Sequence, residues 1–199
     1  MTKATVVLIM ISLAGFSVCP SQSDTGAFVH KGLFRTEATF TPGIFLKGGL
    51  TATYLSGNLE YYFHRNVSFR GDGYYFLGYL DKEKPFVFNH SVLAGASYHF
   101  ATKNHWDPYL GFQPGIALSQ SNELVTMMDT SHAWVVVERK SYASFQPLVS
   151  TILGANYYFQ KVFHIFGEIR FTNGKHISGF PARSLSDIKL SFGLGFNFN

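Results

Sequence analysis

The chain ends in Ile188-Lys-Leu-Ser-Phe-Gly-Leu-Gly-Phe-Asn-Phe-Asn199, which is the most regular stretch of the sequence. Every second position is small or polar, and the positions between are large and apolar: Ile188, Leu190, Phe192, Leu194, Phe196 and Phe198. Since successive side chains of a strand point to opposite faces, this alternation predicts a β-strand. One apolar face and one small or polar face suit a wall between lipid and a polar interior. A soluble sandwich would show the same period.

Three other segments end in the same way. The shared pattern of glycine, aromatic residue and Phe occurs in Gly95-Ala-Ser-Tyr-His-Phe100, Gly154-Ala-Asn-Tyr-Tyr-Phe159 and Gly193-Leu-Gly-Phe-Asn-Phe198, and Asn58-Leu-Glu-Tyr-Tyr-Phe63 differs only at its first residue. After each ending except the last comes a short polar break and another alternating run. The repeat therefore predicts hairpins that share one edge, with the aromatic endings at a membrane interface.

The alternating runs add up to eight strands. They are expected at about 33–45, 50–63, 67–79, 91–100, 108–119, 142–159, 165–172 and 185–198. The connections at the other edge lengthen from a tight turn at 46–49 to 80–90, 120–141 and 173–184. Short turns on one side and longer loops on the other are typical of outer-membrane barrels. We therefore predict an all-β fold, an eight-stranded antiparallel up-and-down transmembrane β-barrel spanning residues 22–199.

The N-terminus and the composition fit this class. Residues 1–21 combine Lys3, a short apolar stretch and a small-residue exit, which predicts a cleaved secretory signal peptide. Cys19 is the only cysteine, and Val18 before it favours removal with the signal over lipidation. Aromatic residues make up 17% of the 199 residues and charged residues 14%, which argues against disorder. The net charge of +4 comes without a basic run interleaved with aromatics, so nucleic-acid binding has no support.

The odd or even position of each residue along its strand places charged side chains on the inward face. If the four terminal Phe side chains face outward, eight charged side chains point inward: Arg35, Glu37, Glu60, Arg70, Asp72, Glu168, Arg170 and Lys189. Four are positive and four are negative, which predicts a network of ion pairs, because a buried charge is unfavourable without a partner. Side chains nearly fill an eight-stranded barrel. The network is either a polar core that satisfies itself, which we favour, or a narrow ion path.

Two turns give a register that can be checked. If the loop is 64–66, Glu60 lies directly opposite Arg70. The same reasoning around 160–164 pairs Asn156 with Glu168 and Gly154 with Arg170.

The whole mature chain resembles the small eight-stranded outer-membrane barrels of the outer-membrane protein A and X type, and more closely the porin-like barrels of Bacteroidetes-type bacteria. The resemblance rests on the signal segment, the Tyr-Tyr-Phe endings and the final strand. It implies a bacterial outer-membrane location, contact with membrane lipid and lipopolysaccharide, and insertion by the barrel-assembly machinery. That machinery would read Phe192, Phe196 and Phe198, although Asn199 follows the final Phe. Members include anchors, adhesins, binding proteins and a few enzymes, so the fold alone does not give the function.

One short motif suggests an enzyme. His176-Ile-Ser178 followed by Asp187 resembles the serine-histidine motif and acidic residue of lipid A deacylase barrels, in which a serine attacks an ester with histidine as base. Gly179 replaces the usual Asn, and strand parity turns His176 and Ser178 towards the lumen unless a bulge at 173–174 reverses it. We therefore favour a non-enzymatic envelope protein, structural or binding through its loops, over a lipid A esterase or a narrow channel.

Two further groups of residues have alternative readings. His64, His99, His105 and His164 lie near the short-turn edge, and their spacing favours interface histidines over a metal site. No cofactor is expected. The segment 120–141 is rich in Met, Trp and Val, which predicts either a binding surface for an unknown ligand or an extended hairpin. We favour the hairpin, with 133–139 pairing across to 118–126.

Overall fold

The computed structural model describes residues 28–100, 105–128, 134–177 and 182–198. The predicted signal segment 1–21, with Cys19, lies outside the described residues. The strands run in chain order as follows: β1 (Phe34–Phe45), β2 (Thr51–His64), β3 (Val67–Tyr79), β4 (Phe86–His99), β5 (Trp106–Met128), β6 (Trp134–Lys140), β7 (Ser144–Tyr158), β8 (Phe163–His176), β9 (Arg183–Ser184) and β10 (Asp187–Phe198). No helix within these ranges is long and apolar enough to cross a membrane.

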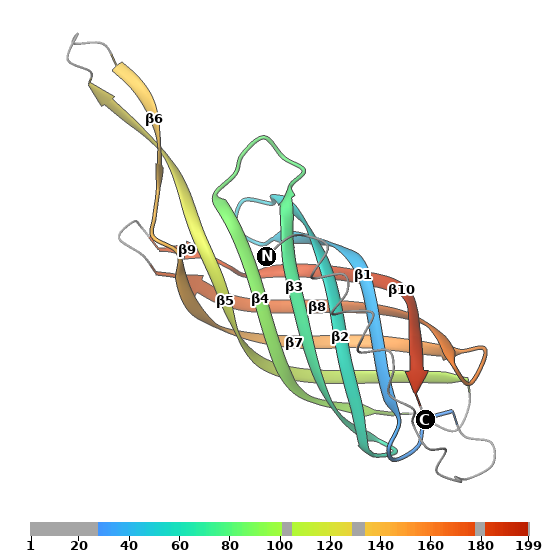
Figure 1. Ribbon diagram of the computed structural model, residues 1–199. Helices are drawn as coiled ribbons and strands as arrows, with labels where there is room; N and C mark the ends of the chain where they lie inside the picture. Colours follow the sequence, from blue (N-terminus) through green and yellow to red (C-terminus); the bar gives the residue numbers. More distant parts are fainter. Residues whose placement is uncertain (1–27, 101–104, 129–133, 178–181, 199) are drawn as a thin grey trace, which may run out of the picture.

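Eight of these strands close into a barrel (Figure 1). Each of β1 to β5, β7, β8 and β10 pairs antiparallel with its neighbours, and β10 pairs with both β8 and β1. Closure gives every strand of this path a hydrogen-bonded neighbour on each side over most of its length. The remaining two strands lie at the long-loop end of the barrel. There β6 pairs with Asn122–Met128 of β5, and β9 pairs with Lys175 and His176 of β8. The predicted fold class is therefore confirmed.

The structure also corrects several strand ends. β4 begins at Phe86 and not at Ser91, and β8 runs from Phe163 to His176, longer than the predicted 165–172. Within the segment 120–141, Asn122–Met128 pair antiparallel with Trp134–Lys140, as expected for the favoured hairpin (Figure 1). Its register differs from the predicted one because β5 continues unbroken to Met128.

One of the two predicted registers is right and the other is wrong. Glu60 pairs with Arg70 across the first short turn, as expected. Across the turn after β7, however, Glu168 pairs with Gly154 and Arg170 with Ile152. The predicted pairing is wrong by two residues because the turn is shorter, with β8 already beginning at Phe163. A shift of two residues keeps every side chain on its predicted face.

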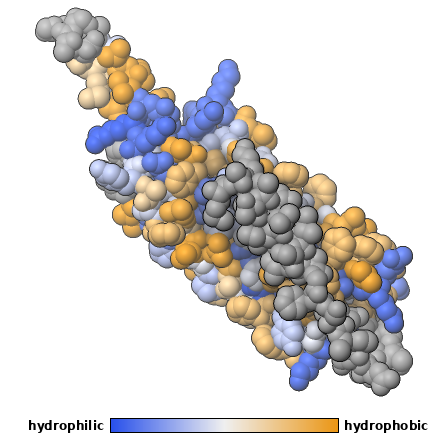
Figure 2. All heavy atoms as spheres, viewed as in Figure 1, coloured by the Kyte–Doolittle hydropathy of each residue, from blue (hydrophilic) through white to orange (hydrophobic). Residues whose placement is uncertain are grey.

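The outer face of the barrel is apolar. Figure 2 shows hydrophobic side chains over much of the visible wall, with hydrophilic ones gathered towards the two ends. In the final strand, Phe192, Phe196 and Phe198 point outward and are 72%, 46% and 43% exposed. Asn199 lies outside the described residues. Exposed Phe, Leu, Ile and Val on alternating positions of adjacent strands form the continuous band that a lipid-facing wall needs.

The repeated glycines make room for large buried side chains. Gly95 pairs with Arg70 on the neighbouring strand, and Gly154 pairs with Glu168 and lies against the ring of Tyr109. A Cβ atom at Gly154 would collide with that ring. The glycine of the repeat is therefore a packing requirement of the filled interior.

We expect Gly154→Ala to lower the free energy of unfolding by about 1–3 kcal/mol, because Tyr109 must move within a packed interior. The matched control is Gly167→Ala on the next strand, where nothing lies within 4 Å of the added Cβ. Urea unfolding in lipid vesicles measures both. Equal effects of the two substitutions would contradict the packing explanation.

Candidate functional site: the ion-paired lumen

Arg70 occupies the middle of the barrel interior. Its guanidinium group lies 2.9 Å from Asp72, 2.6 Å from Glu168 and 3.6 Å from Glu37. It also donates to the hydroxyl of Tyr109 at 2.9 Å, and Tyr109 in turn donates to Glu168 at 3.0 Å. All of these side chains are almost fully shielded from solvent. Each carboxylate contacts a cation, as buried charges require.

Arg170 extends this centre towards β5. Its guanidinium group lies 2.8 Å from Asp72, and it donates to Gln113 at 2.5 Å and to Ser150 at 3.1 Å. Gln113 also donates to Asp72 at 2.6 Å, so its amide bridges the arginine and the carboxylate. The planar fork of arginine suits such multiple contacts.

A second centre lies nearer the short turns. Arg35 forms an ion pair with Glu60 and lies 3.4 Å from Asp107. The ring of His99 lies between the same two carboxylates, with Nδ1 2.8 Å from Asp107 and Nε2 3.2 Å from Glu60. This geometry suits the protonated imidazolium, because only that form donates from both ring nitrogens. Tyr158 donates to Asp107 at 3.1 Å.

A third centre lies towards the long loops. Lys189 is buried, and its ammonium group lies 2.6 Å from Asp187. The same ammonium group lies 5.0 Å from the ring centre of Tyr54 and 5.2 Å from that of Tyr74. Aromatic faces attract cations, so the two tyrosines replace part of the hydration that Lys189 loses on burial.

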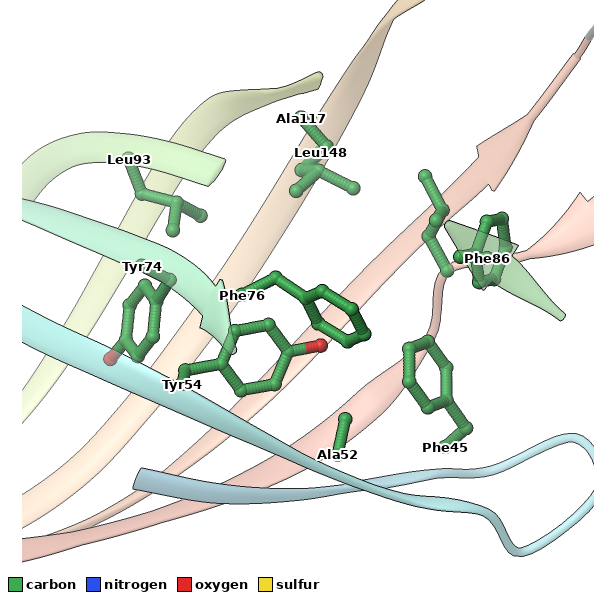
Figure 3. Packing of buried hydrophobic residues seen from close by; sticks show 10 residues of the cluster. Phe45, Ala52, Tyr54, Tyr74, Phe76, Phe86, Leu93, Ala117 and Leu148 are labelled. Atoms are coloured by element: carbon green, nitrogen blue, oxygen red, sulfur yellow. The ribbon is translucent and has the colours of Figure 1, made fainter. Parts of the chain in front are cut away.

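Apolar side chains close both ends of this polar interior. At the loop end, a buried cluster contains Phe45, Phe76, Phe86, Leu148 and Leu185, whose neighbours Tyr54 and Tyr74 border the third centre (Figure 3). At the short-turn end, Val29 and Leu33 pack against Tyr62 and Tyr158. A cavity in the middle, lined by Glu37, Arg70 and Glu168 among others, has a volume of about 10 Å³. That is room for about one water molecule.

The structure brings the eight predicted charges together and adds more. All eight lie inside, and each takes part in an ion pair. The predicted balance of four against four is wrong, because Asp107 and Asp187 are also buried, which gives six carboxylates against Arg35, Arg70, Arg170 and Lys189. Sequence reasoning missed Asp107 because it was assigned to a break, whereas β5 already begins at Trp106. With that boundary, the same parity rule would have found it.

The histidines near the short turns divide into two kinds. His99 and His164 are buried in the lumen, where His164 Nε2 lies 2.9 Å from Glu37, so the prediction of interface histidines is wrong for these two. His64 and His105 are exposed. Within the described ranges, no group of three or more His, Cys, Asp or Glu is arranged to hold a metal ion.

The candidate esterase residues do not meet within the described part of the chain. His176 is buried in the lumen, with Nδ1 2.9 Å from the hydroxyl of Ser119 and Nε2 3.4 Å from that of Ser141. Asp187 contacts Lys189 and not His176 in the described contacts. Ser178 lies outside the described residues. The imidazole thus faces away from the lipid that an esterase on lipid A would have to reach.

Several solved structures have a similar architecture. The N-terminal β-barrel domain of Pseudomonas aeruginosa OprF is 16% identical, with 84% of this chain and 98% of that chain covered and a TM-score of 0.56. Neisserial surface protein A (NspA) is 15% identical over 83% and 96%, with a TM-score of 0.61. The outer membrane protein OprG from Pseudomonas aeruginosa is 13% identical over 87% and 99%, with a TM-score of 0.61.

The fold is that of the small outer-membrane barrels. No protein-family model and no curated protein sequence matches the chain. Identities this low relate the chain to these proteins by fold alone.

Proposed function

We propose that the chain is an integral protein of a bacterial outer membrane that acts through its wall and its outward loops, and whose lumen is closed. The observation that carries the proposal is the layered interior, in which three ion-paired centres lie between two apolar clusters. Such an interior stabilises a wall and leaves little room for a solute or a substrate. The fold shared with outer-membrane barrels and the apolar outer face support the location.

The orientation and the assembly route follow from the same features. The short turns between β2 and β3 and between β7 and β8 would face the periplasm, and the long β5–β6 hairpin would face outward. The barrel-assembly machinery would insert the chain by recognising the last strand, which presents Phe192, Phe196 and Phe198 on its outer face. The outward hairpin and its neighbouring loops are then the parts that meet membrane lipid, lipopolysaccharide or an external ligand.

An epitope tag placed in the hairpin tests the location and the orientation together. We expect a tag inserted at 129–133 to be labelled by antibody on intact Gram-negative cells, and the chain to fractionate with the outer membrane. The matched control is the same tag at Arg65, in a short turn, which antibody should reach only after the outer membrane is opened. Labelling of both tags only in opened cells, or recovery of the chain in a soluble fraction, would contradict the proposal.

A further inference from the structure

The barrel wall is split between β3 and β4 at the loop end. The pairing of these two strands ends at Tyr74 and Ser91, although β3 continues to Tyr79 and β4 already begins at Phe86. Beyond this point β3 pairs only with β2, and β4 pairs only with β5 (Figure 1). Two strand edges therefore face each other without a ladder of hydrogen bonds. In contact with lipid, such unpaired backbone is unfavourable unless something else supplies partners.

A hollow of about 640 Å³ occupies the split. Its apolar part is formed by Tyr75, Leu77 and Val87, which are exposed and continue the lipid-facing band. His90 forms its lower limit, with its ring stacked on Tyr75 at 4.4 Å and its Nδ1 accepting the backbone N–H of Phe76 at 3.0 Å. Phe76 and the buried Phe86 behind it belong to the apolar cluster that closes the lumen. The hollow is thus open to the outside and shut towards the barrel interior.

The upper part of the hollow is polar, and its net charge is positive. Lys84, Lys140 and Glu138 line it, and neither of the two exposed lysines has an ion-pair partner within 4.0 Å in the described part of the chain. Asn122 lies beside them, with its Nδ2 donating to Glu138 and its buried Oδ1 without a hydrogen-bond partner among the residues that the structure describes. A neighbouring hollow of about 400 Å³ shares Lys84 and Glu138 and adds Lys82, Glu83 and Arg183, so its net charge is also positive. This end of the split thus offers two exposed lysines without an ion-pair partner among the described residues, beside one carboxylate.

We propose that the split binds the headgroup of a phosphorylated glycolipid from the outer leaflet. The phosphate would lie against Lys84 and Lys140, and an acyl chain would follow Tyr75 and Leu77. The volume fits this assignment, because pockets for ligand groups of this size measure about 300–1,000 Å³. A lipid also explains why the apolar side of the hollow is continuous with the membrane-facing wall. The inference rests on the proposed outer-membrane location.

The test measures lipid retained by the full-length protein in phosphatidylcholine vesicles that contain a monophosphorylated acylated glucosamine disaccharide. We expect the double variant Lys84→Gln with Lys140→Gln to bind this lipid about thirtyfold more weakly than the wild type, since each of the two lysines near a membrane surface contributes about one kilocalorie per mole. The matched control, Lys161→Gln with Lys175→Gln, also removes two exposed lysines and should bind as the wild type does.

Two further probes separate the sources of the phosphate. The dephosphorylated lipid should bind the wild type as weakly as the phosphorylated lipid binds the variant with Lys84→Gln and Lys140→Gln. Inorganic phosphate alone should not displace the phosphorylated lipid from the wild type. Equal binding of the lipid to both double variants, equal binding of the dephosphorylated lipid, or displacement by phosphate alone would overturn the inference. Insertion is scored separately by the heat-dependent gel migration of the barrel. A chain that fails to insert refutes the proposed function, whereas an inserted chain without lipid binding refutes only this site.

Discussion

Replacing Arg70 by methionine is expected to lower the free energy of unfolding by about 3–5 kcal/mol, the range for removing one partner of a buried ion pair. Arg70 is the cation shared by Asp72, Glu168 and Glu37, and Arg170 reaches only part of that set. Methionine fills much of the volume and leaves the carboxylates without their central partner. Urea unfolding of the protein refolded in lipid vesicles, followed by the fluorescence of Trp106 and Trp134, measures the change.

The control for Arg70 is Lys161→Met, which removes an exposed charge from a short turn and should change the free energy of unfolding by less than about 0.5 kcal/mol. An Arg70→Met effect no larger than that of the control would show that the ion-paired interior does not hold the barrel together.

Replacing Asp107 by leucine is also expected to lower the free energy of unfolding by about 3–5 kcal/mol. The reason is that the carboxylate pairs with two cationic groups and accepts hydrogen bonds from two tyrosine hydroxyls. It contacts Arg35 at 3.4 Å and His99 at 2.8 Å, and it accepts hydrogen bonds from Tyr62 at 3.2 Å and Tyr158 at 3.1 Å. All of these partners are buried. The same unfolding measurement applies.

A double-mutant cycle separates the ion pair from the loss of volume. If Asp107 acts through His99, Asp107→Leu should be much less harmful in a His99→Phe background than in the wild type. Additive effects of the two substitutions would contradict the coupling. Glu83→Leu, in an exposed loop, is the control for a carboxylate without such partners.

Alternation alone was enough to predict the barrel and eight of the ten inward charges. In a strand the face of a side chain depends only on odd or even position, so Glu168 and Arg170 face inward even though their predicted partners were wrong by two residues. Partners depend on turn length, and the turn after Tyr158 is tighter than its polar sequence indicates. The ends of β4 and β5 were also missed, because strands that rise above a membrane continue through polar residues.

The centre around Arg35 could be predicted only in part. Arg35 and Glu60 lie within clear alternating runs, whereas His99 and Asp107 flank a polar break, whose sequence predicts an interface residue and a loop residue. The hydrogen bonds of His99 and Asp107 with Tyr62 and Tyr158 connect β2, β4, β5 and β7 across the interior. Contacts across the interior depend on the stagger of the closed barrel, which alternation does not encode. The split between β3 and β4 is likewise a property of pairing and not of either strand's own sequence.

The central claim is that the interior is closed, and the conductance of single molecules in a planar phosphatidylcholine bilayer tests it most directly. The three ion-paired centres and the two apolar clusters predict that the purified, heat-shift-competent barrel gives no conductance steps above those of the bare bilayer. Steady steps that grow with salt concentration, from protein shown to be inserted, would mean that a wet path crosses the interior and would contradict the account.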